Sequence, residues 1–280
     1  MSIHFHSRAA ATLEPIDEHT PIVAFENVSI AFDLNVVLKS ISFTVDHGQT
    51  LILLGPAGTG KSVLLKLANG LLKPDTGDIT VFGEDVAHMH EVDLFKLRGR
   101  IGMVFQESAL FDSLSVEENV AYRLHEDDMP ADQAHDLVVQ SLDFVELGHA
   151  INKFPSELSG GMRRRASIAR AIITKPDLIL YDSPTGGLDP ITSTTIVDLV
   201  IKQRDVTHTT SLLVTHRLQD AFTLATQRFN TTDQKVEPIP NGGIDDSTQF
   251  LVLNEGSIVF HGTTQQLVSS EDPWLKEYLS

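Results

Sequence analysis

The sequence contains a phosphate-binding loop between an apolar strand and a helix. Residues 55–62 read GPAGTGKS, which has the spacing G-x-x-x-x-G-K-S, and they follow the apolar run LILL. Gly58 and Gly60 allow the backbone to curl so that successive N–H groups point inward, and the start of the next helix adds partial positive charge. Lys61 would reach the outer phosphates, and the Ser62 hydroxyl would ligate Mg²⁺. The pattern predicts a nucleoside-triphosphate site formed by Gly55, Pro56, Ala57, Gly58, Thr59, Gly60, Lys61, Ser62 and Val63.

A second stretch places an aspartate at the end of an apolar run, where it could bind a metal ion. Residues 178–190 read LILYDSPTGGLDP, a short apolar run that ends in Asp182 before a proline-glycine turn. This layout is typical of a buried strand that presents one carboxylate at its end. Chemistry on a phosphate usually employs a second acid beside the first as a general base, and this chain has Ser183 there.

The elements that must position these residues alternate between strands and helices. Strand-like patterns occupy 22–45, 51–54, 101–105, 178–182 and 211–216, and a final strand pair occupies 250–262. Helical spacing is found at 61–72, 131–149, 157–173 and 191–204, and a short helix closes the chain. The alternation predicts an α/β fold with a mostly parallel sheet and crossover connections.

Two segments interrupt this alternation, and the chain start differs from the rest. The block 107–160 is mainly helical and predicts an inserted helical lobe within one domain, 21–280. Residues 230–248 are rich in Pro, Gly, Asn and Asp and predict a surface loop, open either to solvent or to a partner. Residues 1–20 are polar without periodicity and predict a flexible tail.

The composition of the chain excludes several classes of function. The 280 residues include 21 basic and 38 acidic side chains, and the net charge of −17 repels nucleic acid and disfavours direct adsorption to acidic lipids. The absence of cysteine excludes disulfides and thiolate metal sites. No run approaches the roughly 20 apolar residues that span a bilayer, and the first residues lack a signal-peptide pattern. We therefore expect a cytoplasmic protein that reaches a membrane only through partner proteins.

Five further motifs follow the phosphate-binding loop in a fixed order. They are MVFQ ending at Gln106, LSGGM at 158–162, LILYD ending at Asp182, GGLD at 186–189 and LLVTH ending at His216. Together they resemble the nucleotide-binding subunit of an ABC transporter, over about residues 22–279. The resemblance implies a P-loop NTPase fold of the ABC-transporter type, with a mixed RecA-like core, an antiparallel β subdomain and an inserted helical subdomain. It also implies ATP and Mg²⁺ as ligands.

The resemblance assigns roles around the chain's own nucleotide. Phe32 would stack on adenine with Val37 beside the ring, although Phe32 is equally consistent with a core aromatic. Gln106 would contact Mg²⁺ or the attacking water, and Asp182 would hold Mg²⁺ through water. His216 would hydrogen-bond the γ-phosphate.

The resemblance also assigns residues that would contact the nucleotide of a partner cassette in a dimer. By the resemblance, Ser159, Gly160, Gly161 and Met162 form a signature that caps the γ-phosphate held by a partner cassette. Asp189 lies in the turn that crosses the pair. The implied assembly is a head-to-tail dimer that sandwiches two ATP molecules. A second copy of this chain is the expected partner.

Three segments resemble one branch of the family, the Mla/Mce lipid-transport ATPases and their plastid relatives. They are 109–122, 155–165 and 272–279, and Met162 stands where most relatives outside that branch carry glutamine. The branch implies a pair of integral membrane permeases, an MCE-domain lipid-binding protein and a peripheral location on the inner face of the cell membrane. Two alternatives remain: the ATPase of another ABC importer or exporter, and a nucleotide-binding regulator that does not drive transport.

Ser183 departs from the family pattern, which has a glutamate that polarises the attacking water. A hydroxyl accepts a proton poorly at neutral pH, and loss of a positioned general base costs about 10²–10⁴ in rate. Three hypotheses follow: slow but real turnover, since phosphoryl transfer depends mostly on positioning; a degenerate half of a heterodimer; or an altered position that traps the ATP-bound state. We take slow turnover as the working hypothesis.

Two histidine pairs are candidate metal ligands. They are His4 with His6 and His88 with His90. Neither pair belongs to a recognisable ligand spacing, so we expect surface histidines.

Overall fold

The computed structural model of the protein describes residues 20–280. The predicted tail therefore lies outside the described residues except for Thr20, and so do His4 and His6. Among the helices within the described range, none combines the length and the apolar character needed to cross a bilayer.

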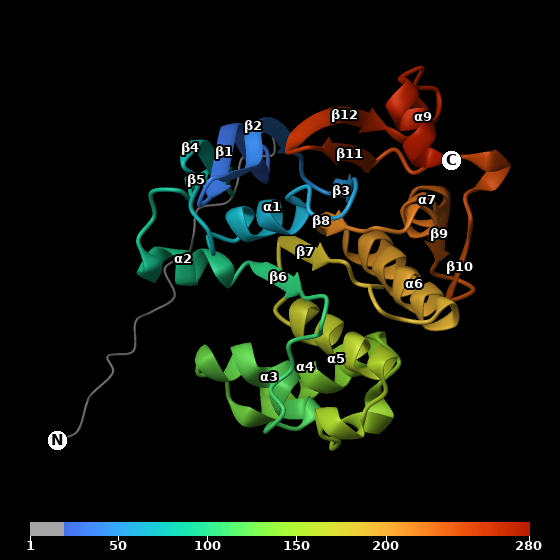
Figure 1. The fold of residues 1–280 in the computed structure, drawn as a ribbon. Coiled ribbons are helices and arrows are strands. Elements are labelled where there is room, and N and C mark those ends of the chain that lie inside the picture. The colour runs from blue at the N-terminus through green and yellow to red at the C-terminus, as the bar shows by residue number, and fades with distance from the viewer. Residues whose placement is uncertain (1–19) are drawn as a thin grey trace.

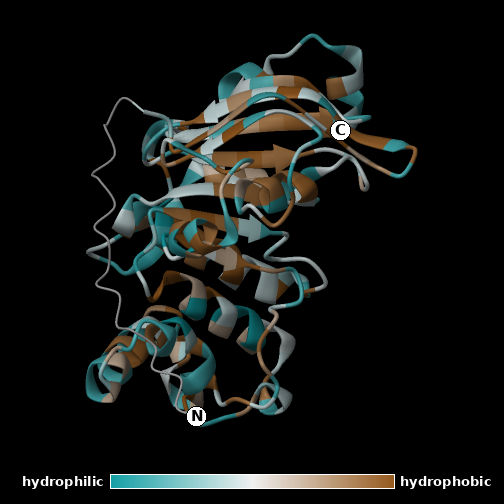
Figure 2. Cartoon of the chain, turned by 90° about the vertical axis from the view of Figure 1, so that its left-hand side faces the viewer, coloured by the Kyte–Doolittle hydropathy of each residue, from teal (hydrophilic) through white to brown (hydrophobic). Residues whose placement is uncertain are grey.

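A six-stranded sheet forms the centre of the molecule (Figure 1). Its strand order is β12 (Ser257–Thr263), β11 (Thr248–Asn254), β3 (Thr50–Leu54), β8 (Thr210–Val214), β7 (Leu178–Asp182) and β6 (Ile101–Val104). All neighbours pair in parallel except β12, which is antiparallel to β11. Strands buried on both faces read as continuous hydrophobic runs, and the strands of this sheet are largely brown in Figure 2. The predicted mixed core is confirmed.

A four-stranded antiparallel sheet packs beside this core. Its order is β2 (Asn35–Val45), β1 (Val23–Phe32), β4 (Thr76–Val81) and β5 (Glu84–Asp85). Phe25 and Phe43 stack with their ring centroids 4.7 Å apart, and they share one buried cluster with Leu51 and Leu64. The antiparallel subdomain predicted for this fold is present.

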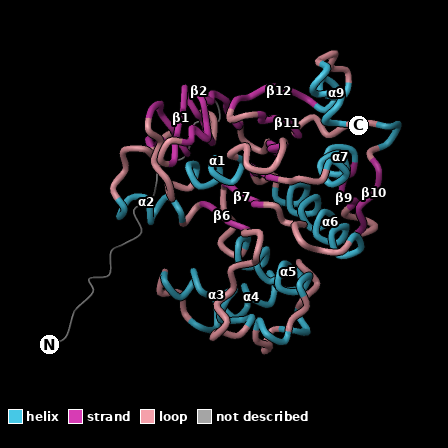
Figure 3. Tube along the Cα trace, viewed as in Figure 1, coloured by secondary structure: helices cyan, strands magenta, loops and turns pink. Residues whose placement is uncertain are grey.

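Helices form a separate lobe below the sheets in Figures 1 and 3. The lobe contains α3 (Val116–Glu126), α4 (Ala131–Phe144) and α5 (Gly160–Ile172), which pack on one another. Ala134, Val138 and Leu142 of α4 are buried, and their spacing places them on one face of the helix. The helix α5 begins at Gly160, where the expected lobe ends, and it packs both on α3 and α4 and on β6 of the central sheet.

The remaining helices border the sheets or close the chain. They are α1 (Lys61–Ala68), α2 (Glu91–Arg98), α6 (Pro190–Thr207), α7 (Leu218–Thr226), α8 (Thr264–Val268) and α9 (Pro273–Leu279). In the described part of the chain, three short 3₁₀ turns occupy Gly148–Ala150, Pro155–Glu157 and Pro240–Gly242.

The segment 230–248 is more ordered than the predicted surface loop. Its residues Lys235–Pro238 form β10, which pairs antiparallel with β9 (Gln227–Asn230). The turn between them is held by Asn230, whose Oδ1 accepts hydrogen bonds from the backbone N–H groups of Thr232 and Asp233. Composition predicted a loop because Asn, Asp and Pro favour turns, but here they frame a short hairpin.

A buried ion pair fixes the far end of this segment. The Arg204 side chain is 5% exposed, with Nη1 3.0 Å from Asp245 Oδ2 and Nε 2.6 Å from Asp205 Oδ1. Replacing Arg204 by methionine should lower the free energy of unfolding by about 3–5 kcal/mol, because two carboxylates lose a buried partner. Chemical denaturation measures the change.

Arg228→Met is the matched control for this prediction. Arg228 of β9 forms an ion pair with Glu237 of β10 at 2.8 Å, but its side chain is 47% exposed. Surface pairs contribute about 0–1 kcal/mol. Equal losses in the two variants would show that Arg204 does not anchor the segment.

Candidate active site

Four adjacent strands end at the edge of the sheet where the predicted site residues lie. The loop 55–62 follows β3, His216 lies two residues after β8, Asp182 ends β7, and Gln106 lies two residues after β6. Ligands of open α/β sheets bind outside the carboxyl ends of parallel strands. The fold therefore brings together residues that are far apart in the sequence (Figure 1).

The phosphate-binding loop has the curled backbone that the sequence predicted. Gly58 and Gly60 have φ values of 79° and 95°, in the left-handed region that glycine adopts without strain. A Cβ on Gly60 would lie 2.6 Å from Leu38 Cδ2 and 3.0 Å from Val37 Cγ1. Val37 therefore lies beside the loop.

Lys61 is buried within this loop. Its Nζ donates hydrogen bonds to Gly55 O at 2.8 Å and Pro56 O at 2.7 Å, and a longer one to Thr59 Oγ1 at 3.3 Å. Burial lowers the pKa of Lys61 to about 8, and the charge of Asp182 partly opposes this shift. A phosphate anion would supply the counter-charge that these neutral carbonyl groups lack.

Ser62 and Asp182 meet directly. Ser62 Oγ donates to Asp182 Oδ1 at 2.8 Å, although the two residues are 120 positions apart. Hydroxyl and carboxylate oxygens are ligands that Mg²⁺ prefers. The donor set therefore fits the predicted ion, with Ser62 and Asp182 as the residues that would hold it.

Ser183 occupies a constrained turn immediately after Asp182. Its φ is 47°, it is 3% exposed, and its N–H donates to Val214 O at 3.0 Å. Within residues 20–280 its Oγ is buried without a hydrogen-bond partner. Buried polar atoms are usually satisfied, so this hydroxyl has capacity for a water molecule.

His216 and Gln106 lie on either side of this turn. Burial and the nearby Lys61 lower the pKa of His216, while Asp182 raises it. A neutral imidazole has one donor and one acceptor nitrogen near pH 7. Gln106 is exposed, and its side chain lies against Gly186, where an added Cβ would be 3.3 Å from Gln106 Cγ.

Phe32 is not a core aromatic. It ends β1 and is 44% exposed. This exposure argues against the core-aromatic alternative for Phe32.

The signature residues adjoin the turn that contains Asp189. Ser159 is the exposed N-cap of α5, and its Oγ accepts a hydrogen bond from Met162 N at 3.3 Å. Asp189 caps α6 and accepts from both the N–H and the hydroxyl of Thr192, at 3.0 and 2.6 Å. A Cβ on Gly161 would collide with the Thr192 methyl group. Gly161 therefore allows the two helix starts to approach closely.

Sequence reasoning assigned no role to two residues that the structure places at the site. Arg164 on α5 donates hydrogen bonds to backbone carbonyls beside Gln106 and Ser183. The Tyr278 hydroxyl on α9 accepts a hydrogen bond from Gly55 N at 2.9 Å, and the Tyr278 ring stacks on Trp274. The runs MRRR and DPWLKEYL contained these residues without revealing their contacts.

Removing the Tyr278 hydroxyl should weaken nucleotide binding. Tyr278→Phe keeps the stack on Trp274 but leaves Gly55 N–H without its partner at the start of the loop. A neutral hydrogen bond contributes about 0.5–1.5 kcal/mol, so we expect the Kd for a fluorescent ATP analogue to rise roughly 2–10-fold. Tyr122 is an exposed tyrosine whose ring centroid lies 4.7 Å from that of Phe111 in a tilted arrangement, and Tyr122→Phe is the control that should leave the Kd unchanged. An unchanged Kd in Tyr278→Phe would contradict the prediction.

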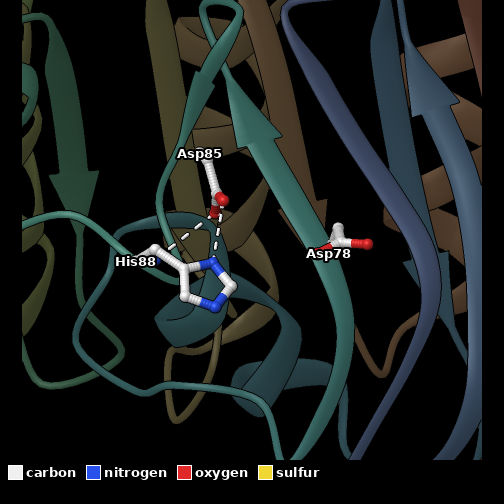
Figure 4. A group of neighbouring side chains, drawn as sticks. All are labelled: Asp78, Asp85 and His88. Atoms are coloured by element: carbon white, nitrogen blue, oxygen red, sulfur yellow. Dashed lines mark hydrogen bonds and ion pairs between the residues drawn. The ribbon is translucent and has the colours of Figure 1, made fainter.

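His88 and His90 lie on the surface. His88 Nδ1 is 2.8 Å from Asp85 Oδ2, and Asp78 completes a group whose possible ligand atoms lie within 4.8 Å of one another (Figure 4). All three side chains are exposed, and His90 is the exposed N-cap of α2. The expected surface position is confirmed for His88 and His90.

The fold and the site define a P-loop nucleotide hydrolase with the signature of one family. Residues 38–186 match the sequence model of the family described as ABC transporter, so the chain belongs to the ABC transporter family. It is an ATP-hydrolysing cassette of that family. The resemblance inferred from the motifs is confirmed.

The chain is similar to two curated proteins and to a solved structure of a cassette. It is 37% identical over 267 residues to Protein TRIGALACTOSYLDIACYLGLYCEROL 3, chloroplastic, of Arabidopsis thaliana, covering 92% of this chain and 73% of that protein. It is 35% identical over 259 residues to the Intermembrane phospholipid transport system ATP-binding protein MlaF of Escherichia coli strain K12, covering 92% and 88%. A similar solved structure is the dimeric post-hydrolysis state of the ATP-binding cassette MJ0796 bound to ADP and Pi, with a TM-score of 0.73, 26% identity and coverage of 86% and 98%.

Proposed function

We propose that the chain energises lipid transport across a cell envelope, as one of two ATPase cassettes of an ABC transporter. The observation that carries the proposal is the joined set Lys61, Ser62 and Asp182, with 2.8 Å between Ser62 Oγ and Asp182 Oδ1, in a chain that aligns along 92% of its length with MlaF. The lipid assignment is supported by the name of that relative, an intermembrane phospholipid transport system.

The residues of the loop would bind and orient the triphosphate. Lys61 exchanges its carbonyl contacts for phosphate oxygens, and the N–H groups at the start of α1 bind the same anion. Ser62 and Asp182 would hold Mg²⁺, which supplies positive charge against the outer phosphates. Phe32 stacks on the adenine, with Val37 beside the ring.

Three groups would order the attacking water. His216 hydrogen-bonds the γ-phosphate, Gln106 and the free Ser183 hydroxyl position the water, and a carboxylate base is missing from this turn. Hydrolysis is therefore slow but real, because positioning and electrostatics supply most of the catalysis in phosphoryl transfer.

The site is completed by a second copy of the chain. The signature Ser159–Met162 caps the partner's γ-phosphate, and Asp189 lies where the two copies cross. The dimeric state of the cassette MJ0796 supports this arrangement. The dimer sits on the cytoplasmic face of the membrane, bound to two permeases and accompanied by an MCE-domain lipid-binding protein.

Purification from native membranes followed by reconstitution tests the proposal. The chain, recovered with its membrane partners, is placed in liposomes that contain a fluorescent phospholipid, and ATP with Mg²⁺ should drive lipid movement between acceptor and donor membranes. Lys61→Met in the same complex is the inactive control. A chain always recovered alone would favour a nucleotide-binding regulator, and a complex that moves a solute and no lipid would favour another ABC importer or exporter.

A further inference from the structure

Arg164 connects the loops around the nucleotide position from inside the protein. It is 3% exposed, and its guanidinium donates to Phe105 O at 2.8 Å, to Gln106 O, and to Gly186 O at 3.3 Å. A longer contact of 3.5 Å reaches Ser183 O. One side chain therefore spans the loop that contains Gln106 and the turn that begins at Ser183.

This cation is unusually placed for a purely structural residue. Across residues 20–280, its hydrogen bonds go to backbone carbonyls, and its Nε is buried without a partner. Burial lowers the pKa of Arg164, and the charge of Asp182 partly opposes that shift. A buried charge without a hydrogen-bonded counter-ion opposes folding, and an apolar side chain would fill the space at lower cost. The arrangement points to a role beyond packing.

The position of Arg164 along α5 suggests that role. Ser159 caps the start of this helix, and Arg164 follows five residues later, about 7.5 Å along the axis at 1.5 Å per residue. A helix moves as a rigid element over so short a distance. Any displacement of its first turn therefore moves the guanidinium, and the carbonyls of Gln106 and Ser183 with it.

We propose that Arg164 is the positioning residue that couples the signature end of α5 to the alignment of Gln106 and Ser183. The inference rests on the proposed head-to-tail dimer, in which the signature contacts the partner's nucleotide. Arg164 touches no nucleotide itself and acts through the backbone of the two loops. ATP captured by the partner subunit thereby adjusts the chain's own site, so the two sites hydrolyse cooperatively.

Arg164→Lys in the full-length protein tests the coupling. Lysine keeps the charge but replaces a planar fork of donors by a single point, which cannot reach carbonyls on both loops. We expect kcat for ATP hydrolysis to fall about tenfold or more. The loss of one hydrogen bond from a charged donor to a neutral acceptor has an effect of this size. The Hill coefficient for ATP should fall towards one, while the Kd of a fluorescent ATP analogue stays within about twofold of wild type, because Lys61 and Ser62 are untouched.

Arg163→Lys is the matched control. Arg163 is the preceding residue of α5 and is exposed, and among residues 20–280 its side chain donates only to Leu158 O, at 2.6 Å. Its kcat and Hill coefficient should remain at wild-type values. Denaturation midpoints of all variants separate folding from coupling, and Arg164→Gln, with the same expected readouts, replaces Arg164→Lys if that variant does not unfold cooperatively.

The outcomes separate the inference from the proposed function. If the wild type dimerises with ATP and Arg164→Lys retains both its kcat and its Hill coefficient, the role of Arg164 is overturned. A fall in kcat that merely follows the folded fraction overturns it as well. A wild type that never dimerises with ATP and Mg²⁺ contradicts the dimer on which both rest, and light scattering reports that state directly.

Discussion

A glutamate at position 183 is expected to raise the steady-state rate of ATP hydrolysis by about 10² or more. Ser183 offers a hydroxyl beside Asp182, whereas a carboxylate would accept the proton of the attacking water, and a positioned general base contributes roughly 10²–10⁴ in rate. Phosphate release by the assembled transporter, wild type against Ser183→Glu, measures the change. The affinity for ATP should stay the same, because the phosphate-binding loop is not altered.

The variant Ser183→Gln distinguishes the effect of a proton acceptor at position 183 from the effect of a longer side chain there. Glutamine has the length of glutamate and can orient water, but it does not accept a proton. A rate increase that is equal in both variants would mean that space or water position limits the wild type. If the glutamate variant is no faster than wild type, the view of Ser183 as the limiting residue is wrong, and a degenerate site paired with a competent partner becomes the better account.

Replacing Lys61 by methionine is expected to weaken ATP binding by roughly 10²-fold or more and to stop hydrolysis. Hydrogen bonds to charged groups contribute about 1.5–3 kcal/mol each, and the ammonium group can bond two phosphates. The stability of the nucleotide-free protein should not decrease through the lost charge, because burial already lowers the pKa of Lys61 to about 8 and so opposes the charged form. Calorimetric titration with ATP and Mg²⁺ gives the affinity.

Lys66→Met is the control on the same helix. Lys66 also lies on α1, but it is exposed. This variant should bind ATP as the wild type does. An affinity change of less than about threefold in Lys61→Met would contradict the proposed phosphate contact, because that corresponds to well under 1 kcal/mol.

The parts of the site that depend on local backbone were predictable from the sequence. Glycines at 58 and 60 predict a curled loop because they adopt left-handed φ values without strain, and the structure has them at 79° and 95°. The strand ending at Asp182 was predictable because a buried parallel strand is apolar throughout. Parallel order then brings Asp182 to Ser62, since the ends of adjacent strands share one edge.

Contacts between distant elements were not predictable in this way. Arg164 reaches Phe105 from 59 positions away, and nothing in MRRR distinguishes the buried arginine from its exposed neighbour. The strands β4 and β5 and the helix α2 were also missed, because 76–85 is short and mixed in polarity and 91–98 is a largely polar helix. The hairpin β9–β10 escaped prediction because turn-forming residues dominate its composition.

The hydrogen bond between Gly55 and Tyr278 joins residues 223 positions apart, and this has a consequence for biosynthesis. The first N–H of the loop, that of Gly55, meets its partner only after α9 has been synthesised. The strand before the loop, β3, likewise waits for β8 and β11, which are made late. Because such long-range pairings form slowly and the chain grows at only about 5–20 residues per second, the nascent protein passes through a stage in which most of the chain exists but no competent nucleotide pocket does. The cassette therefore completes its nucleotide pocket only after the segment from β8 to α9 has been synthesised.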